Sequence, residues 1–281
     1  MTVCTSALTD AYSRLTGVYP GLTVTELDGA ERAPRSGGWV SAAALAEGGA
    51  GLDAFLAWDD AQVLRDHGRA GRPDVIAGFG LHRYAWPACL LITAPWFLHR
   101  RVPRFPVTHV HYDRTAGPMA FAVRTGAFAC LPGDPAAALP GARVVADEEA
   151  LRAEVREAVA EHMEPVLHGF GPRMRRRERA LWGMVTDEIV EGLWYVAQLL
   201  GESEQERARR ELELLLPGST RPYVGAAAFR QLTGPRGEAL PTRDRASCCM
   251  YYTLEPQDTC VTCPRTCDAD RVVKLLADAA S

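Results

Sequence analysis

Apolar residues recur at helical spacing over much of the chain. The spacing predicts helices over residues 52–67, 147–170 and 176–200, because apolar positions three and four apart line one helix face. Gly68 and Gly201 follow two of these segments, as glycine commonly does at a helix C-terminus. These patterns predict a mostly helical body.

Candidate N-caps mark the starts of several helices. Asp74 precedes a segment that is apolar nearly all round, and Asp147 precedes a segment with acidic residues in its first turn. Ser203 is followed three residues later by Glu206, which is the arrangement of a capping box. Shorter helices are expected over residues 2–16 and 268–280.

The most apolar run extends from Trp86 to Phe97 and contains two prolines. It is about twelve residues long, whereas a helix that spans a bilayer needs roughly 20. We interpret it as a buried core segment. The polar N-terminal stretch also lacks the apolar core of a signal peptide. We therefore expect a soluble, cytoplasmic protein without a transmembrane segment, for which membrane association would be transient.

The pattern changes after Pro106. Residues 107–113 alternate with period two, and residues 119–132 contain two short apolar runs around a turn. We expect a small antiparallel β-meander here. Helical patterning ends near residue 240, so we expect a body of residues 1–240 and a C-terminal segment of residues 241–281. The predicted fold class is α+β.

Charge excludes one class of partner. The net charge is −4 and hydrophobic residues make up 47% of the chain, enough for one large core or two smaller ones. No basic cluster dominates the sequence, so we expect no nucleic-acid binding.

Cysteines carry the candidate chemistry. Of eight cysteines, Cys4, Cys89 and Cys130 stand alone and are interpreted as small buried or incidental thiols. The other five crowd into the C-terminal segment. In a reducing cytosol such a cluster favours metal binding over a disulfide framework. These five are Cys248, Cys249, Cys260, Cys263 and Cys267.

Four thiolates are the ligand set of a tetrahedral zinc site or of an iron–sulfur cluster. The spacing Cys260-x-x-Cys263 suits either. Adjacent Cys248 and Cys249 favour a binuclear cluster, because neighbouring residues in extended backbone point in opposite directions and close poorly on one ion. A structural zinc site and a pair of redox disulfides remain alternatives.

The stretch CCMYYTLEPQDTCVTCP has the pattern C-C-x10-C-x2-C and resembles the C-terminal [2Fe–2S] motif of the FhuF-like ferric siderophore reductases. The stretch LWGMVTD from Leu181 is similar to a Leu-Trp-Gly stretch in the middle of those proteins. The resemblance implies a [2Fe–2S] cluster held by four residues, and Cys267 lies outside the pattern. The implied ligands are Cys248, Cys249, Cys260 and Cys263.

The resemblance also implies a reaction, in which one electron passes from the cluster to a ferric siderophore, of hydroxamate type by preference, and Fe(II) is released. The sequence contains no GxGxxG fingerprint, so we expect an external donor such as a ferredoxin or a ferredoxin/flavodoxin reductase. The alternatives are an iron–sulfur electron carrier without its own siderophore site and a structural zinc-binding protein.

Two groups of polar residues are candidates around this chemistry. An Arg- and His-rich stretch is the candidate siderophore-docking site, and a second basic run, Arg173–Arg179, is a candidate partner surface. Side chains beside the cysteines are candidate hydrogen-bond donors to sulfur, and Tyr251 and Tyr252 are candidate shields of the cluster. The docking candidates are Arg100, Arg101, Arg104, His109 and His111; the candidate donors are Ser247, Thr259, Thr262 and Arg265.

Overall fold

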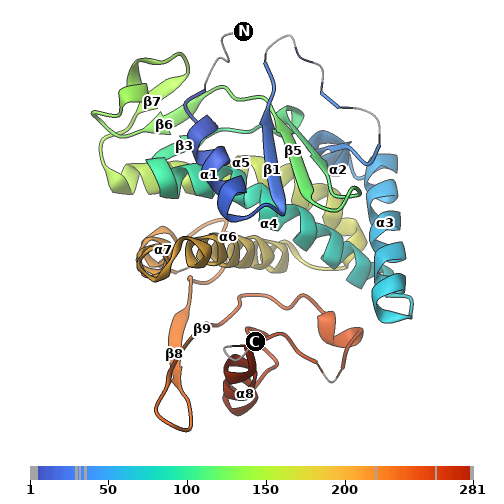
Figure 1. The fold of residues 1–281 in the computed structure, drawn as a ribbon. Coiled ribbons are helices and arrows are strands. Elements are labelled where there is room, and N and C mark those ends of the chain that lie inside the picture. Colours follow the sequence, from blue (N-terminus) through green and yellow to red (C-terminus); the bar gives the residue numbers. More distant parts are fainter. Residues whose placement is uncertain are drawn as a thin grey trace.

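Three long helices form the centre of the protein. The computed structural model describes residues 6–278 except residues 29, 30, 32, 35, 36, 219 and 257. Helix α4 (Pro73–His99) packs against both α5 (Glu148–Met174) and α6 (Glu178–Leu200). Two small sheets lie on one side of this helical layer, and the C-terminal part of the chain lies on the other, beneath α6 (Figure 1).

Among the described residues, five shorter helices and three 3-10 turns complete the helical part. The order along the chain matches the predicted helices, apart from α2, which the Gly- and Ala-rich sequence did not indicate. The helices are α1 (Thr9–Val18), α2 (Ala42–Glu47), α3 (Ala50–His67), α7 (Glu202–Leu215) and α8 (Asp268–Asp278), and the turns are η1 (Val107–His109), η2 (Pro135–Ala138) and η3 (Tyr251–Thr253).

The strands form three small sheets. A four-stranded sheet has the order β1-β5-β4-β2, a three-stranded sheet the order β3-β6-β7, and β8 and β9 form a hairpin. Long helices with small sheets confirm the α+β class. The strands are β1 (Leu22–Glu26), β2 (Val40–Ser41), β3 (Arg101–Pro103), β4 (Val110–Asp113), β5 (Met119–Val123), β6 (Phe128–Cys130), β7 (Ala142–Val144), β8 (Phe229–Thr233) and β9 (Ala239–Arg243).

The sheets are more mixed than the predicted meander. The antiparallel pairing of β4 with β5 is as expected, but β1 joins β5 in parallel and β6 leaves to pair with β3 and β7. All three residues of β6 are buried. A strand that is buried on both faces needs cover on both sides, which a simple meander would not supply.

Two predicted caps are wrong, and one is confirmed. Helix α4 begins at Pro73, whose fixed φ suits the first helical position, so Asp74 lies in the first turn. Gly201 precedes α7, which places Ser203 inside the helix. Asp147 caps α5 as predicted, because its side chain accepts from the Ala150 N–H at 2.9 Å.

Helix α4 is the core of the protein. It is long and apolar enough to span a membrane, but 78% of its most apolar window is buried inside the protein, as in the core helix of a soluble protein. The run from Trp86 to Phe97 is therefore core, as predicted. Near its middle, His82, Arg83 and Trp86 are only half-buried and form a more polar face.

The C-terminal part is built from the β8–β9 hairpin, the cysteine loop and α8. The predicted boundary between residues 240 and 241 falls inside β9, which pairs with β8 along its whole length. The division into two domains stays a prediction, and a boundary ahead of β8 would keep the hairpin whole.

Gly169→Ala should destabilise the fold, since α5 and α2 meet backbone to backbone at this residue. A Cβ at Gly169 would lie 2.2 Å from the Leu45 carbonyl oxygen and 2.8 Å from that of Ala46. We expect a loss of about 1–3 kcal/mol in the free energy of unfolding, measured by urea denaturation. Gly17→Ala is the control, because nothing lies within 4 Å of its Cβ position. Equal urea midpoints for the two variants would contradict this contact.

Candidate metal centre

The four cysteines of the predicted ligand set lie in one loop between β9 and α8. Cys263 is 2% exposed, whereas the other three are half-buried, and all four are free thiols. Cys89 and Cys130 are buried elsewhere, as predicted for packing thiols, and Cys267 is exposed. Cys4 lies outside the described residues.

The sulfurs interact with one another. The Cys260 thiol donates to Cys249, and this hydrogen bond lowers the pKa of Cys249 to about 5 and raises that of Cys260. Burial raises the pKa of Cys248, and the nearby Cys249 and Cys263 add to the shift. Within the described residues, no three His, Cys, Asp or Glu side chains converge closely enough to hold a single metal ion.

Backbone amides donate to three of the sulfurs. The Met250 and Arg265 N–H groups lie 3.4 Å from the sulfurs of Cys248 and Cys263, and the amide of Tyr251 donates to Cys249. Met250 has a φ of 67°, a left-handed conformation that turns the chain back over the cysteine pair. Such N–H···S bonds stabilise thiolates and tune the potential of an iron–sulfur cluster.

Three of the four side chains predicted to donate to sulfur have other partners. The Thr262 hydroxyl donates to Glu191 at 2.9 Å, and Thr259 bonds the hydroxyl of Thr266 at 2.6 Å. The Arg265 guanidinium covers the Tyr252 ring, 4.1 Å from its centroid, while its amide is the group that faces sulfur. The Ser247 amide donates to Asp187, whereas the Ser247 hydroxyl is buried without a hydrogen-bond partner among the described residues, so its role as a donor to sulfur stays a prediction.

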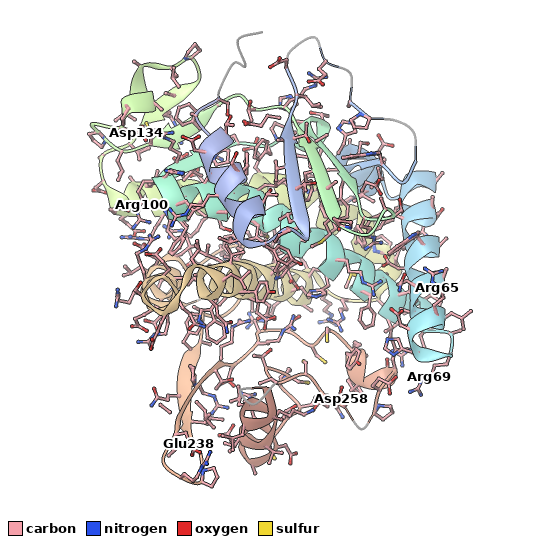
Figure 2. The ribbon with its side chains drawn as sticks, viewed as in Figure 1. Arg65, Arg69, Arg100, Asp134, Glu238 and Asp258 are labelled. Atoms are coloured by element: carbon pink, nitrogen blue, oxygen red, sulfur yellow. The ribbon has the colours of Figure 1, made fainter. Side chains whose placement is uncertain are left out.

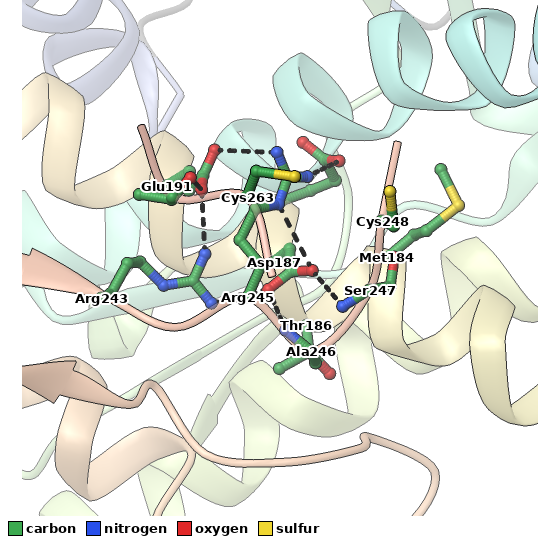
Figure 3. A network of polar contacts seen from close by, with 12 residues as sticks. Met184, Thr186, Asp187, Glu191, Arg243, Arg245, Ala246, Ser247, Cys248 and Cys263 are labelled. Carbon is green, nitrogen blue, oxygen red and sulfur yellow. Dashed lines mark hydrogen bonds and ion pairs between the residues drawn. The ribbon is translucent and has the colours of Figure 1, made fainter. Parts of the chain in front are cut away.

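Acidic side chains of α6 hold the cysteine loop in place. Asp187 accepts from the amides of Ala246 and Ser247, each at 2.9 Å, and from the fully buried Arg243 guanidinium at 2.6 Å (Figure 3). Glu191 accepts from Arg243 at 3.1 Å and from Thr262. Both ends of the cysteine loop are therefore fixed to the same helix.

Arg245 places a buried positive charge beside the cysteines. Its side chain is 6% exposed and lies 3.6–3.7 Å from carboxylate oxygens of Asp187, Glu188 and Glu191. Burial alone would lower the pKa of Arg245, but these acids and Cys249 raise it well above its usual value. The guanidinium stays charged and offsets the negative charge that four thiolates bring together.

The residues just ahead of the cysteine pair pack against the LWGMVTD stretch of α6. A Cβ at Gly183 would lie 3.3 Å from the Ser247 Cβ and 3.4 Å from the Ala246 carbonyl oxygen. The absence of a side chain at Gly183 lets the loop approach the helix closely, and Asp187 then binds its amides. This contact explains why both stretches occur in one chain.

Other contacts anchor the far side of the loop. Leu254 is buried against Val63, Val75 and Ile76 of α3 and α4. Tyr251, one of the two predicted shielding tyrosines, packs edge-on against Phe79. The other, Tyr252, has the Arg265 guanidinium over its ring.

Helix α8 closes the loop from below. The nearly buried Arg271 donates to the Cys263 carbonyl at 3.2 Å and to the Arg243 carbonyl at 3.3 Å. Arg271 also pairs with Asp244 at 2.8 Å. Arg271 thereby joins the second cysteine pair to Arg243, the buried last residue of β9, which is bound by acids of α6.

A cavity of about 520 Å³ opens beside the second cysteine pair. Thr262, which precedes Cys263, lines it. Three rings form an aromatic wall of edge-to-face and tilted contacts with centroid distances of 5.6–6.0 Å: Tyr19, Trp86 and Tyr195. Trp194, His82 and Glu191 line it as well.

His82 connects the cavity to the buried acids. Its Nδ1 lies 2.8 Å from Glu188, which is fully buried. Burial lowers the pKa of His82, but attraction to Glu188 and their hydrogen bond outweigh burial, so the net shift is upward. Sequence reasoning missed this residue and the acids of α6. Two features of the sequence could have indicated these residues: charged side chains inside two otherwise apolar helices, and Arg243 and Arg245 just ahead of the cysteine pair.

The predicted docking residues lie away from the cysteines. Figure 2 places Arg100 and Asp134 at the opposite end of the molecule from Asp258 of the cysteine loop. Each arginine has acidic partners: Arg100 pairs with Glu148 and Glu211, Arg101 with Asp134, and Arg104 with Glu154, Glu157 and Glu161.

The two histidines of the candidate docking group do not lie on one strand. His109 ends η1, so only His111 lies on β4, opposite Ser41 of β2 and Ala122 of β5. A docking role for this group stays a prediction, and the structure brings none of these five residues to the cysteine loop.

Comparison with known proteins supports the cysteine motif. Residues 245–265 match the family model described as FhuF 2Fe-2S C-terminal domain. The resemblance of the cysteine segment to that family is thereby confirmed, and the match implies a [2Fe–2S] cluster. No curated protein matches the chain.

The residues present fit such a cluster. Four cysteines lie in one loop, amides face three of their sulfurs, and a buried guanidinium compensates their charge. The four ligands were predicted from the sequence, and their individual roles stay a prediction.

Cys249→Ser and Cys263→Ser should each abolish the visible absorption and the EPR signal of the reduced cluster, because each removes a thiolate ligand. Iron should fall from about two per chain towards zero in anaerobic preparations. Cys267→Ser is the matched control, since Cys267 is exposed and lies outside the motif. A native spectrum in either ligand variant would remove that cysteine from the ligand set.

Arg245→Gln should lower the reduction potential of the cluster. Reduction adds a negative charge, and the neutral amide no longer offsets it, so we expect a shift on the order of 50–100 mV. Arg245→Lys keeps the charge and should stay closer to the parent value. The potentials are measured by redox titration followed by EPR. Identical potentials in all three proteins would show that the guanidinium charge does not act on the cluster.

Proposed function

We propose that this protein is a cytoplasmic ferric-siderophore reductase that transfers one electron to a ferric siderophore, of hydroxamate type by preference, and releases Fe(II). The match of residues 245–265 to the FhuF 2Fe-2S C-terminal domain supports an iron–sulfur protein of this kind. The observation that carries the proposal is the cavity beside Cys263, because it gives the cysteine loop a neighbouring site for a substrate.

When bound, the [2Fe–2S] cluster supplies single electrons at low potential. The chain has to hold the siderophore within reach of that electron. Thr262 is both a wall of the cavity and a neighbour of Cys263, and its hydroxyl is fixed by Glu191. A complex in the cavity would therefore lie directly against the cysteine loop.

The walls of the cavity suit an iron chelate with an organic backbone. Tyr19, Trp86 and Tyr195 provide aromatic surface, whereas His82 and Gln198 offer hydrogen bonds to ligand oxygens. Fe(III) binds hard oxygen ligands tightly. The added electron lowers its charge and weakens each Fe–O bond, so the iron can pass to softer ligands.

An electron carrier without a siderophore site is the second candidate function. A carrier would explain the cysteine motif as well as a reductase does, but a carrier would not need an aromatic cavity beside the cysteine loop. We propose an external one-electron donor for either function.

The experiment that separates the candidates is anaerobic reduction followed by mixing with ferric complexes. The protein is reduced with dithionite, excess reductant is removed, and ferric hydroxamate and catecholate siderophores are added in turn. A reductase is expected to be reoxidised with one Fe(II) trapped per electron. Unchanged reduced spectra with every ferric complex would leave the carrier, and a colourless protein that contains zinc and no iron would exclude both.

Tyr195→Ala should weaken siderophore binding, because it removes one ring of the aromatic wall. An aromatic contact contributes about 0.5–1.5 kcal/mol, so we expect KM for the ferric siderophore to rise about 2- to 12-fold with little change in kcat. Leu199→Ala is the control: both side chains are 42% exposed on α6, but Leu199 does not line the cavity. Equal KM values in both variants would place the substrate elsewhere.

A further inference from the structure

We propose that the arginine-rich junction of α5 and α6, together with Arg72 at the start of α4, is the docking surface for a small acidic electron-transfer protein. This donor would deliver its electron on the Cys248 side of the loop. The inference deepens the proposed function and depends on it only in that the cysteine loop must hold a redox centre. We call Arg72, Arg173, Arg175, Arg176, Arg177 and Arg179 the arginine surface.

The arginine surface carries excess positive charge. Arg175, Arg177 and Arg179 are exposed, and Arg177 and Arg179 have no acidic partner in the part of the chain that the structure describes. Asp74 pairs with Arg72 and Asp53 with Arg173, so two of the positive charges are offset. A third acid, Glu178, does not balance the remaining four arginines.

The arginine surface also contains a cavity. A cavity of about 420 Å³ lies between the start of α4 and the end of α5, lined by Arg72, Pro73, Asp74, Arg173 and Arg175. Guanidinium groups around a hollow suit a carboxylate-rich surface, because each can bind a carboxylate with two hydrogen bonds.

Arginines at the start of a helix do not stabilise it. Arg177 is the N-cap of α6 and makes no side-chain cap, and Arg179 lies in the first turn. The positive end of the helix dipole disfavours arginine at both positions. A partner that brings negative charge to this helix start would relieve the conflict.

The arginine surface leads directly to the first cysteine pair. The Arg176 guanidinium lies 3.6 Å from the sulfur of Met184. Gly183 lies against Ser247, and Met184 and Cys248 are the next residues on each side of this contact. The half-buried Arg176 and the buried Met184 therefore lie between the exposed arginines and the first cysteine pair.

The surface does not overlap the siderophore cavity. At about 1.5 Å per residue, Arg179 and Tyr195 are about 24 Å apart along α6. The cysteine loop touches the helix between them, at Gly183, Asp187 and Glu191. A donor protein and a ferric siderophore can therefore be bound at the same time. One electron leaves the reduced donor, which is oxidised, and one electron reduces Fe(III) to Fe(II) at the other end.

Charge reversal tests the assignment. Reduced acidic plant-type [2Fe–2S] ferredoxin is mixed with the oxidised holoprotein, and the second-order rate constant of electron transfer is measured at several ionic strengths. Arg177→Glu/Arg179→Glu should slow the reaction about 10- to 100-fold at low salt, and the difference should shrink as salt screens the charges. The neutral pair Arg177→Gln/Arg179→Gln should lose less.

Two controls make the result decisive. Arg209→Glu/Arg210→Glu changes the net charge equally on the exposed face of α7 and should leave the rate within about twofold of the parent. Dithionite reduction needs no docking, so it reports the integrity of each variant separately from ferredoxin. Equal losses in both charge-reversed pairs, or no loss in either, would overturn the docking surface. Failure of the reduced protein to reduce ferric siderophore would refute the reductase but leave the docking result standing.

Discussion

The contact between Asp187 and the backbone ahead of the cysteine pair is the constraint on which the site depends. One carboxylate accepts two amides and a fully buried guanidinium, so three elements meet at a single side chain. Removing one partner of such a buried pair typically costs 3–5 kcal/mol, because a charge is left uncompensated. The loop has little regular structure of its own, and α6 supplies the order that a metal centre requires.

This arrangement explains why a short motif comes with a long helical body. The family match covers residues 245–265, yet the groups that fix those residues lie on α4, α6 and α8. Glu191 binds both Arg243 and Thr262, so the two cysteine pairs share one support. An isolated loop would lack that support, because the acids that hold Arg245 and Thr262 in place belong to α6.

Local features of the site could be predicted from the sequence, and long-range ones could not. The grouping of the four cysteines in one loop and the burial of α4 both follow from patterns among neighbouring residues, so both were predicted correctly. The bond from Ser247 to Asp187 joins residues sixty positions apart. Nothing near Thr262 indicates that the partner of its hydroxyl is a carboxylate of α6 and not sulfur. Arg100, Arg101 and Arg104 seemed available for a substrate because their acidic partners, on α7, in the loop after β6 and on α5, are 33 to 111 positions away in the sequence.

Helix α6 connects the fold to the proposed function. A continuous helix keeps its two ends at a fixed separation, so the arginine surface, the cysteine loop and the aromatic cavity hold a constant order along it. Buried charge at the middle is compensated by Arg243 and Arg245, which leaves the exposed arginines at the start uncompensated. The same helix that excludes water from the acids beneath the cysteines thus presents different chemistry at its ends: positive charge at the proposed donor surface, and aromatic rings at the proposed siderophore cavity.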